Sequence, residues 1–301
     1  NGQFFGWGVQ PSAMLSDIKR RLRYGKEHQV TGFLARTDWE GVQDWTCFDN
    51  LNMVNLYAIA AYAENENTSE EEIYLRWLQG EHMLDERLSP GQLKTCVQTV
   101  KEIMDETWPI VEKTNFVNGC LFSNDSCMHL TPEQFTFIGG THHSLSEWDP
   151  EKKDALEMSV ENIARIIEDK EEAHVKCEKL VDRVVAGNMG LTEDAYEKMK
   201  EHFEFMRWYV RGFRLTARGY CFGRYVTEKN AADMLVEGKT ANVLLEETIH
   251  EMEKYREGLL QTTFIKKYPF DAQLNPERVA FYTNSLKRML AQGKKVEIVE
   301  D

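Results

Sequence analysis

The feature that most constrains the fold is a change of pattern near residue 48. Before it, "GQFFGWGV" is typical of a short strand entering a loop, "PSAMLSDIKRRLRYGKEH" of a helix, and "VTGFLART" of a buried strand. Strand, helix and strand within about forty residues form a βαβ unit, which implies a parallel sheet. Two strands cannot make a buried parallel sheet, and no later segment offers convincing companions. The first part of the chain therefore predicts a sheet that the rest does not complete.

From residue 49 onward the pattern is almost wholly helical. Apolar residues recur at three-to-four spacing, for example at Ile163, Ile166 and Ile167, which predicts amphipathic helices. Helices of this kind pack antiparallel into a bundle, so the fold class is predicted to be mainly α. The expected helices cover 50–63, 68–80, 90–113, 151–186, 192–229, about 231–260 and 275–293.

Residue types at the ends of these segments match helix start and stop signals. The expected N-caps are Asp49, Thr68 or Ser69, Ser89 and Asn275. Gly80 and Gly293 are expected to stop their helices, because glycine accepts the left-handed conformation that commonly follows a helix. Pro109 is expected to kink the 90–113 helix, since proline lacks the N–H that a helix interior needs.

Residues 114–150 have little periodicity but are rich in aromatic residues and histidine. Structureless stretches longer than about 12–15 residues are uncommon in compact domains unless they are functional or disordered. Their aromatic content argues against disorder. A loop that presents His142, His143 and Trp148 would shape a ligand pocket; the alternative is a compact loop that only covers the bundle.

Composition limits the partners of the chain. It has 301 residues, 42% of them hydrophobic, which is enough for one large domain or two smaller ones. The net charge of −14 argues against nucleic acid or an anionic membrane as the main partner. Neither a signal-peptide core nor an apolar run near eighteen residues is present, so we expect a cytoplasmic protein, with an upstream leader left open.

The six cysteines are scattered, at positions 47, 96, 120, 127, 177 and 221. They contain no C-x-x-C pair and no cysteine–histidine pair with zinc spacing. We expect buried free thiols, although an even number leaves disulfides possible. Neither a metal nor a cofactor is expected.

One cluster near a predicted strand end could carry chemistry. Arg36, Asp38 and Trp39 follow the second predicted strand, and active sites of α/β barrels lie at the carboxyl ends of strands. Arginine can bind a carboxylate through two hydrogen bonds, and tryptophan can stack on a sugar ring. A structural ion pair beside a packed tryptophan is the alternative reading. Metalloprotease, P-loop and serine-hydrolase motifs are absent from the sequence.

The segments "RTDWEG" and "NMVNLYAIAAYAENENTSEEEIYLRWL" together resemble the late part of family-67 glycoside hydrolases, the α-glucuronidases, and their relatives. That family shows N-W-x-G, followed by A-N-L-Y and then L-S-x-E-E-I with a later tryptophan. The matching positions are Asp38, Trp39, Gly41, Asn55, Leu56, Tyr57, Asn67, Ser69, Glu71, Glu72, Ile73 and Trp77. The resemblance implies the end of a (β/α)₈ barrel followed by a helical C-terminal domain.

The resemblance also implies a sugar site. It places Gln3 where the family has a catalytic carboxylate, and an amide cannot act as a general base. "THHSLSEW" resembles a histidine-containing segment that covers the sugar pocket in the family. The implied substrate-binding residues are Arg36, Asp38, Trp39, His142, His143 and Trp148. The family's acid catalyst lies on an earlier strand and has no counterpart here.

These inferences predict three domains: the last strands of a barrel at 1–48, helices and a covering loop at 49–150, and a helical bundle at 151–301. The resemblance implies that the chain is the C-terminal part of a glycoside hydrolase for uronic-acid-containing glycans, that it forms a homodimer in the family's manner and that it is not catalytic alone. The alternative is a non-enzymatic helical module for interaction or dimerisation. A concave site joining Arg36, His142 and Trp148 would favour the enzyme.

Overall fold

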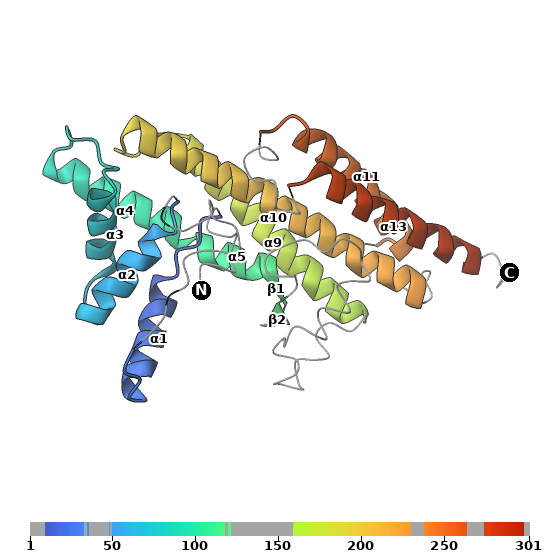
Figure 1. Ribbon diagram of the computed structural model, residues 1–301. Coiled ribbons are helices and arrows are strands. Elements are labelled where there is room, and N and C mark those ends of the chain that lie inside the picture. The colour runs from blue at the N-terminus through green and yellow to red at the C-terminus, as the bar shows by residue number, and fades with distance from the viewer. Residues whose placement is uncertain are drawn as a thin grey trace. The chain divides into compact units, whose positions relative to one another are not determined.

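Figure 1 shows the computed structural model of the chain, which is mainly helical, so the predicted fold class is confirmed at this level. It describes residues 10–32, 35, 48, 50–117, 120–121, 159–229, 238–263 and 274–297. The β structure in these ranges includes an antiparallel pair, β1 Phe116–Val117 with β2 Cys120–Leu121, and a bridge between Leu84 and Leu191; Lys239 also lies in a bridge. Within the same ranges, every helix is too short or too polar to span a lipid bilayer.

The chain divides into two compact units. Unit 1 combines Asn1–Val111 with Val175–Arg207, and unit 2 combines Glu112–His174 with Trp208–Asp301. Each unit therefore joins segments that are far apart in the sequence. The predicted boundaries after residues 48 and 150 fall beside or within stretches outside the described residues, so the predicted three-domain division stays a prediction.

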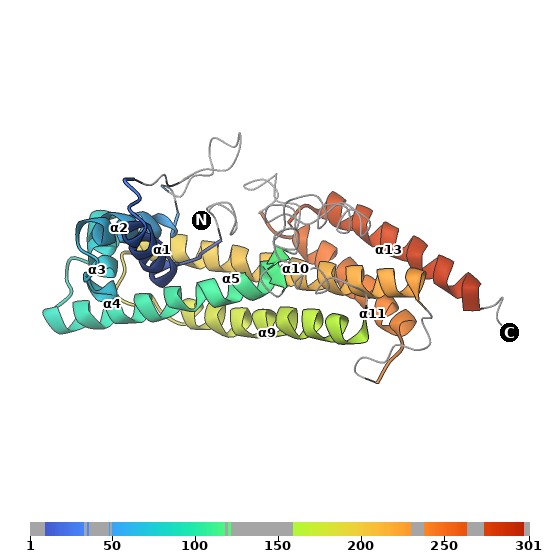
Figure 2. The ribbon, with the colours of Figure 1, turned by 90° about the horizontal axis from the view of Figure 1, so that it is seen from below.

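Unit 1 contains four helices from the first part of the chain: α1 Leu15–Glu27, α2 Met53–Glu64, α3 Glu70–Gly80 and α4 Pro90–Asp105. They pack in series, α1 on α2, α2 on α3 and α3 on α4 (Figure 1 and Figure 2). Their buried side chains include Val54, Ala58, Ile73, Tyr74, Trp77, Val97 and Val100. The aromatic residues of α2 and α3 are thus buried largely by neighbouring helices.

Side-chain caps begin three helices where the sequence predicts them. Ser69 accepts a hydrogen bond from the Glu72 N–H (3.2 Å) at the start of α3. Ser89 forms a reciprocal capping box with Gln92 at the start of α4. Asn275 accepts from two N–H groups in the first turn of α13 Pro276–Glu297. These bonds satisfy amide groups that lack partners within a helix.

Two predicted helix limits are wrong in the first half of the chain. The 90–113 segment forms two helices, since α4 ends at Asp105 and α5 Thr107–Asn115 follows Glu106. Pro109 lies in the first turn of α5, where its missing N–H removes no intrahelical bond. The 50–63 segment starts later than expected, at Met53, with Asn52 in place of Asp49 as the N-cap residue. Asp49 itself lies outside the described residues.

Of the two glycines expected to stop helices, Gly80 does end its helix and Gly293 does not, and both allow close packing. Gly80 is the last residue of α3, and a Cβ there would collide with the hydroxyl of Tyr57 on α2. Gly293 lies inside α13, which runs on to Glu297, and a Cβ there would collide with the side chain of Val226. Both glycines let a neighbouring side chain approach the helix backbone, a role that the sequence alone does not distinguish from a stop.

Unit 2 contains the first part of α9 Val160–Val185, most of α10 Glu193–Glu228, and the whole of α11 Ala241–Leu259 and α13. Helix α11 packs against α13. Tyr255 of α11 donates a hydrogen bond to the Trp208 carbonyl (2.9 Å), and Tyr282 of α13 donates to the Thr216 carbonyl (3.2 Å). The predicted apolar stripe of α9 is confirmed, because Ile163, Ile166 and Ile167 are buried.

A buried lysine joins α9 to the end of α5. Lys170 Nζ donates hydrogen bonds to the carbonyls of Lys113 and Phe116, both at 2.6 Å. The residue is only 1% exposed, and burial lowers the pKa of its ammonium to about 7, although the neighbouring Asp169 opposes that shift. The lysine therefore satisfies two carbonyls at the point where α5 passes into β1.

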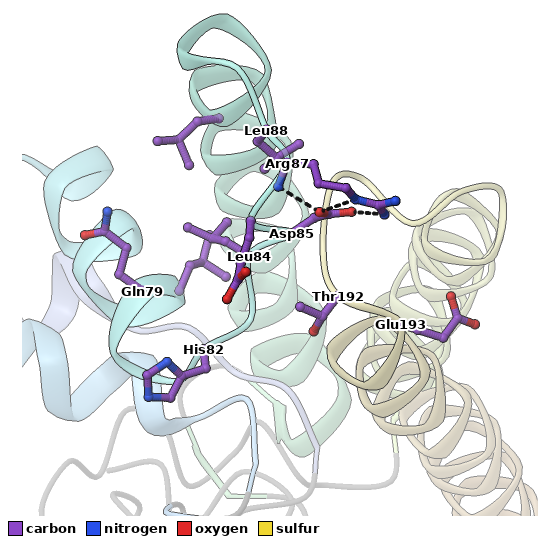
Figure 3. A pocket seen from close by; sticks show the side chains of 11 residues that line it. Gln79, His82, Leu84, Asp85, Arg87, Leu88, Thr192 and Glu193 are labelled. Atoms are coloured by element: carbon purple, nitrogen blue, oxygen red, sulfur yellow. Dashed lines mark hydrogen bonds and ion pairs between the residues drawn. The ribbon is translucent and has the colours of Figure 1, made fainter.

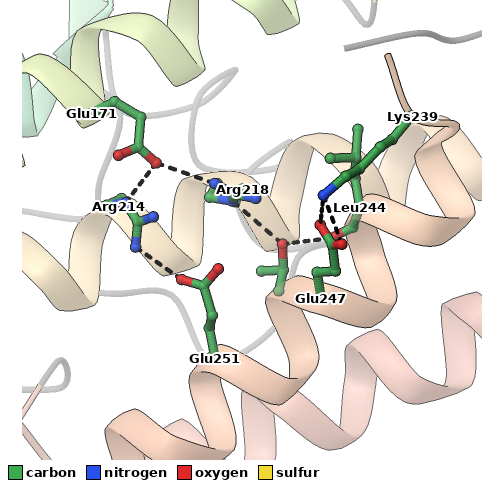
Figure 4. Close-up of polar contacts among 8 residues, drawn as sticks. Glu171, Arg214, Arg218, Lys239, Leu244, Glu247 and Glu251 are labelled. Carbon is green, nitrogen blue, oxygen red and sulfur yellow. Dashed lines mark hydrogen bonds and ion pairs between the residues drawn. The ribbon is translucent and has the colours of Figure 1, made fainter. Parts of the chain in front are cut away.

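Charged side chains connect α9, α10 and α11 inside unit 2 (Figure 4). Glu171 of α9 accepts from Arg214 (2.6 Å) and from Arg218 (3.1 Å) of α10. Arg214 also binds Glu251 of α11 at 3.0 Å. Arg218 is buried and directs its Nε toward the Thr248 hydroxyl at 3.5 Å. Glu171 is therefore the shared acceptor for two arginines, one of them with little access to water.

Three cysteines are buried free thiols, as predicted: Cys96, Cys177 and Cys221. Burial raises the thiol pKa of Cys96 to about 11 and of Cys221 to about 12, and it raises that of Cys177 as well. Thiols with raised pKa values are poor nucleophiles near neutral pH. The side chains of the other three cysteines lie outside the described residues.

Replacing Lys170 by methionine tests the buried amine. Its pKa is about 7 in the folded protein but near 10.4 when unfolded, so between these values the unfolded chain binds more protons and the stability contributed by Lys170 rises with pH. We expect the unfolding free energy of wild type, minus that of K170M, to increase by about 1.5 kcal/mol from pH 7 to 8.5 in urea titrations. The exposed control K179M should show a constant difference, and a constant difference for K170M would contradict the shifted pKa.

Replacing Glu171 by glutamine tests the charged network. The change leaves Arg214 and the buried Arg218 without their shared carboxylate, so we expect a loss of about 1–3 kcal/mol in unfolding free energy. The matched control is E168Q, an exposed position on the same helix, with an expected change within about 0.5 kcal/mol. Equal effects of the two substitutions in chemical denaturation would show that the network contributes nothing.

Candidate functional site

The residues predicted to form a sugar site cannot be placed. All seven lie outside the described part of the chain: Gln3, Arg36, Asp38, Trp39, His142, His143 and Trp148. Of the second predicted strand, Val30–Gly32 and Ala35 are described, and these residues are not in strand conformation. The site and its geometry therefore stay predictions, and the candidate site in the described residues is the structure that adjoins them.

That structure is the asparagine junction, formed by Gln10–Met14 with Asn52 and Asn55. Asn52 accepts a hydrogen bond from the Ser12 N–H (2.7 Å) and donates to the Gln10 carbonyl (2.9 Å). Because its side chain is used in this way, Asn52 makes no capping bond to its own helix, although it occupies the N-cap position. The Asn50 side chain accepts from the Asn52 N–H (2.8 Å) and so fixes its backbone.

Asn55 completes the junction one turn further along α2. Its side-chain oxygen accepts from the Met14 N–H (2.8 Å), and its amide nitrogen donates to the Ser12 carbonyl (2.8 Å). Thr107 accepts from the Ala13 N–H between them (2.9 Å). All of these side chains are buried. A non-helical backbone segment thus obtains from side chains the hydrogen bonds that a neighbouring strand would otherwise supply.

Sequence reasoning did not find the junction, although a signal for it exists. Asn52 and Asn55 are three residues apart, which places them on one face of a helix, and asparagine carries both a donor and an acceptor. Polar residues on the buried face of an apolar helix must find partners. The sequence does not identify the partners, because they are backbone groups 40 or more residues away.

Gln10 gives the junction an unsatisfied polar group. The residue is fully buried, and in the part of the chain that the structure describes neither polar atom of its side-chain amide has a hydrogen-bond partner. Leaving a buried amide unpaired costs about 1–3 kcal/mol, so such a group in a folded protein calls for an explanation. The Asn115 side chain is buried and, among the described residues, unpaired in the same way, so the junction is the leading candidate because it adjoins the predicted site residues in the sequence.

A hollow of 660 Å³ lies between the α3–α4 connection and the start of α10 (Figure 3). Gln79 and His82 line one side, Thr192 and Glu193 the other, and the Asp85–Arg87 ion pair lies between them. Hydrogen bonds to Arg87 lower the pKa of Asp85 to about 2. Asp85 therefore stays ionised near neutral pH and cannot serve as a general acid.

A second hollow of 380 Å³ shares His82 and Thr192 with the first. It adds Trp77, Asp194 and Lys198 to its lining, but Trp77 is only 1% exposed and offers no face for a sugar to stack on. The described residues also contain no group of three histidine, cysteine or acidic side chains that could hold a metal ion. Both hollows are lined mainly by polar and charged side chains.

Comparison of the chain with models of protein families, with curated proteins and with solved structures found no match. The resemblance to family-67 glycoside hydrolases is therefore not supported by a match to a family model, a curated protein or a solved structure. The assignment of function depends on the residues themselves.

Replacing Asn55 by alanine tests the junction. The change removes the hydrogen-bond partner of the buried Met14 N–H and of the Ser12 carbonyl. We therefore expect a loss of about 2–4 kcal/mol in unfolding free energy and faster hydrogen exchange at Met14. Asn67 is an exposed asparagine in the turn after α2, and N67A should change stability by less than about 0.5 kcal/mol. If N55A and N67A behave alike, the junction does not hold the segment.

Proposed function

We propose that this chain is the C-terminal part of a glycoside hydrolase that acts on uronic-acid-containing glycans, in the manner of α-glucuronidases. The observation that carries the proposal is the asparagine junction. Asn55, one of the residues in the N-L-Y segment on which the resemblance depends, binds the backbone of Ser12 and Met14. In this proposal, residues 10–14 lead directly out of the first predicted barrel strand at 2–9.

The junction has a physical purpose in such an enzyme. Groups at a strand end must be held to within a fraction of an ångström to act on a substrate, and a segment without a partner strand does not hold itself. Helix α2 would supply that rigidity, because Asn52 and Asn55 bind the segment at three of its residues. Gln10, with its unpaired buried amide, would then be the junction residue next to the predicted strand.

The rest of the barrel belongs to the proposal as well. Helix α1 would follow the predicted barrel strand at 2–9. Val30–Gly32 and Ala35 are not in strand conformation, so the remaining strands, like the acid catalyst, would come from chain outside these 301 residues. A TIM barrel takes about 250 residues, so the chain by itself would bind a sugar without hydrolysing it. Dimerisation through the helical domain is part of the same proposal.

Gln3 and Arg36 would have different roles in this site. An amide donates and accepts hydrogen bonds but takes up no proton, so Gln3 would orient the sugar rather than activate water. Arg36 would bind the uronate carboxylate through two hydrogen bonds. Trp39 would stack on the sugar ring, and His142, His143 and Trp148 would cover it. No cofactor is required for this chemistry.

Binding of D-glucuronate to the purified chain tests the proposal by calorimetry, after native and denaturing mass measurements establish the assembly. We expect R36Q to weaken glucuronate binding by about tenfold or more, because it removes a charge-assisted pair. The control R76Q changes an exposed arginine of α3 and should leave binding unchanged. A 35 kDa chain that self-associates and binds no glucuronate would instead favour the helical interaction module.

A further inference from the structure

Helix α1 carries a concentration of positive charge on an acidic protein. Five of its thirteen residues are basic, at positions 19, 20, 21, 23 and 26, whereas the chain as a whole has a net charge of −14. Only two residues of the helix are acidic, Asp17 and Glu27. The C-terminal half of α1 is mostly exposed, so this charge faces solvent rather than the core of unit 1.

The cations of α1 are unequally neutralised. Asp17 binds both Arg20 and Arg21, and these bonds lower its pKa against the opposing effect of burial. Lys26 approaches Glu66 only to 3.7 Å, with 77% of the lysine side chain exposed. Arg23 has neither an ion pair nor a hydrogen bond from its side chain to any residue that the structure describes.

Four of the five cations line a hollow of 430 Å³ between α1 and the end of α2. Its lining has four basic side chains, Lys19, Arg21, Arg23 and Lys26, and two acidic ones, Glu64 and Glu66. The volume falls within the range of small-molecule sites, about 300–1,000 Å³. The excess of cations leaves the hollow suited to a negatively charged ligand.

The apolar part of the hollow is fixed by the way α1 ends. Gln29 takes a left-handed conformation (φ 57°), which turns the chain so that the Val30 N–H binds the Gly25 carbonyl (2.9 Å). Val30 thereby lies against Gly25, where a Cβ would be 3.6 Å from it, and forms one wall with 59% of its surface exposed. Tyr62 of α2 is buried and contributes its ring, over which Lys19 lies at 5.3 Å.

We propose that this hollow binds an acidic oligosaccharide, with Arg23 and Lys26 holding a uronate carboxylate and Val30 contacting a sugar ring. Arginine binds carboxylates through paired hydrogen bonds, and lysine adds a point charge. The site is lined by α1, the residues after it and α2, includes none of the residues predicted at the strand ends, and would bind a further part of the glycan. The choice of a glycan rests on the proposed function, whereas the preference for an anion rests on the hollow alone.

The other polyanions are less well matched. Nucleic acid would meet the repulsion of a chain with net charge −14, and the hollow is too small to follow a phosphate backbone. An acidic peptide would use the same cations but has no sugar ring to place on Val30. Glutamate oligomers therefore serve as the comparison in the test.

The test follows the amide signals of Gly25 and Gly32, which line the hollow, in a glycine-labelled protein by NMR. The probe is a glucuronic-acid-substituted xylo-oligosaccharide, with the unsubstituted xylo-oligosaccharide of equal length as its neutral counterpart. We expect the acidic probe to shift both signals, the neutral one to leave them unchanged, and the double variant R23Q/K26Q to weaken binding by about tenfold or more. Added salt should weaken it as well.

Control variants separate this inference from the proposed function. K94Q changes an exposed lysine on α4 and should leave the shifts intact. R36Q removes the cation of the proposed strand-end site, which is not among the residues that line the hollow, so the shifts should persist in it. Shifts at Gly25 and Gly32 that survive R36Q would support the hollow even if calorimetry finds no Arg36-dependent binding of D-glucuronate, the result that would overturn the proposed function. Absence of shifts with the acidic probe, or an equal response to glutamate oligomers, would overturn the glycan assignment.

Discussion

Hydrogen bonds from two asparagine side chains hold unit 1 together at its least regular point. Gln10–Ala13 lies buried outside the helices and strands, and a buried backbone cannot leave its polar groups unpaired. Asn52 and Asn55 supply those partners from α2, and Thr107 adds one from the start of α5. The position of α1 follows, because the chain enters α1 directly from this segment. A hydrophobic contact could bury the segment but could not provide hydrogen-bond partners for its backbone N–H and C=O groups.

In unit 2, charged side chains provide the partners for buried polar groups. Lys170 satisfies two carbonyls where α5 ends, and Glu171, the next residue, gathers Arg214 and Arg218 on the neighbouring helix. Adjacent residues on a helix point about 100° apart, so one turn of α9 serves two different neighbours. Burial makes these groups sensitive to substitution, because removal of one partner leaves the other charge unpaired where water cannot replace that partner. The buried polar contacts of unit 2 therefore specify which residues of neighbouring helices face each other, in addition to the apolar packing.

The functional proposals depend on two kinds of observation. The strand-end site derives from motif residues such as Arg36 and Trp39, and the structure contributes the rigid junction that would support it. The hollow on α1 derives from the structure, because only the folded chain shows that Arg23 and Lys26 border one space with Val30 and Tyr62. An acidic protein that recognises acidic sugars must concentrate its positive charge locally, and α1 is where the described residues do so.

The sequence by itself determined the helical class, the caps at Ser69, Ser89 and Asn275, and the apolar stripe of α9, because these depend on neighbours within a few residues. It did not determine why Gly80 and Gly293 are glycines, where α2 begins, or what the two asparagines bind. Each of these depends on a group from a distant segment, such as Tyr57 above Gly80 or the backbone of Ser12 beside Asn55. Local propensity carries no information about which segments meet, so only the tertiary structure decided them.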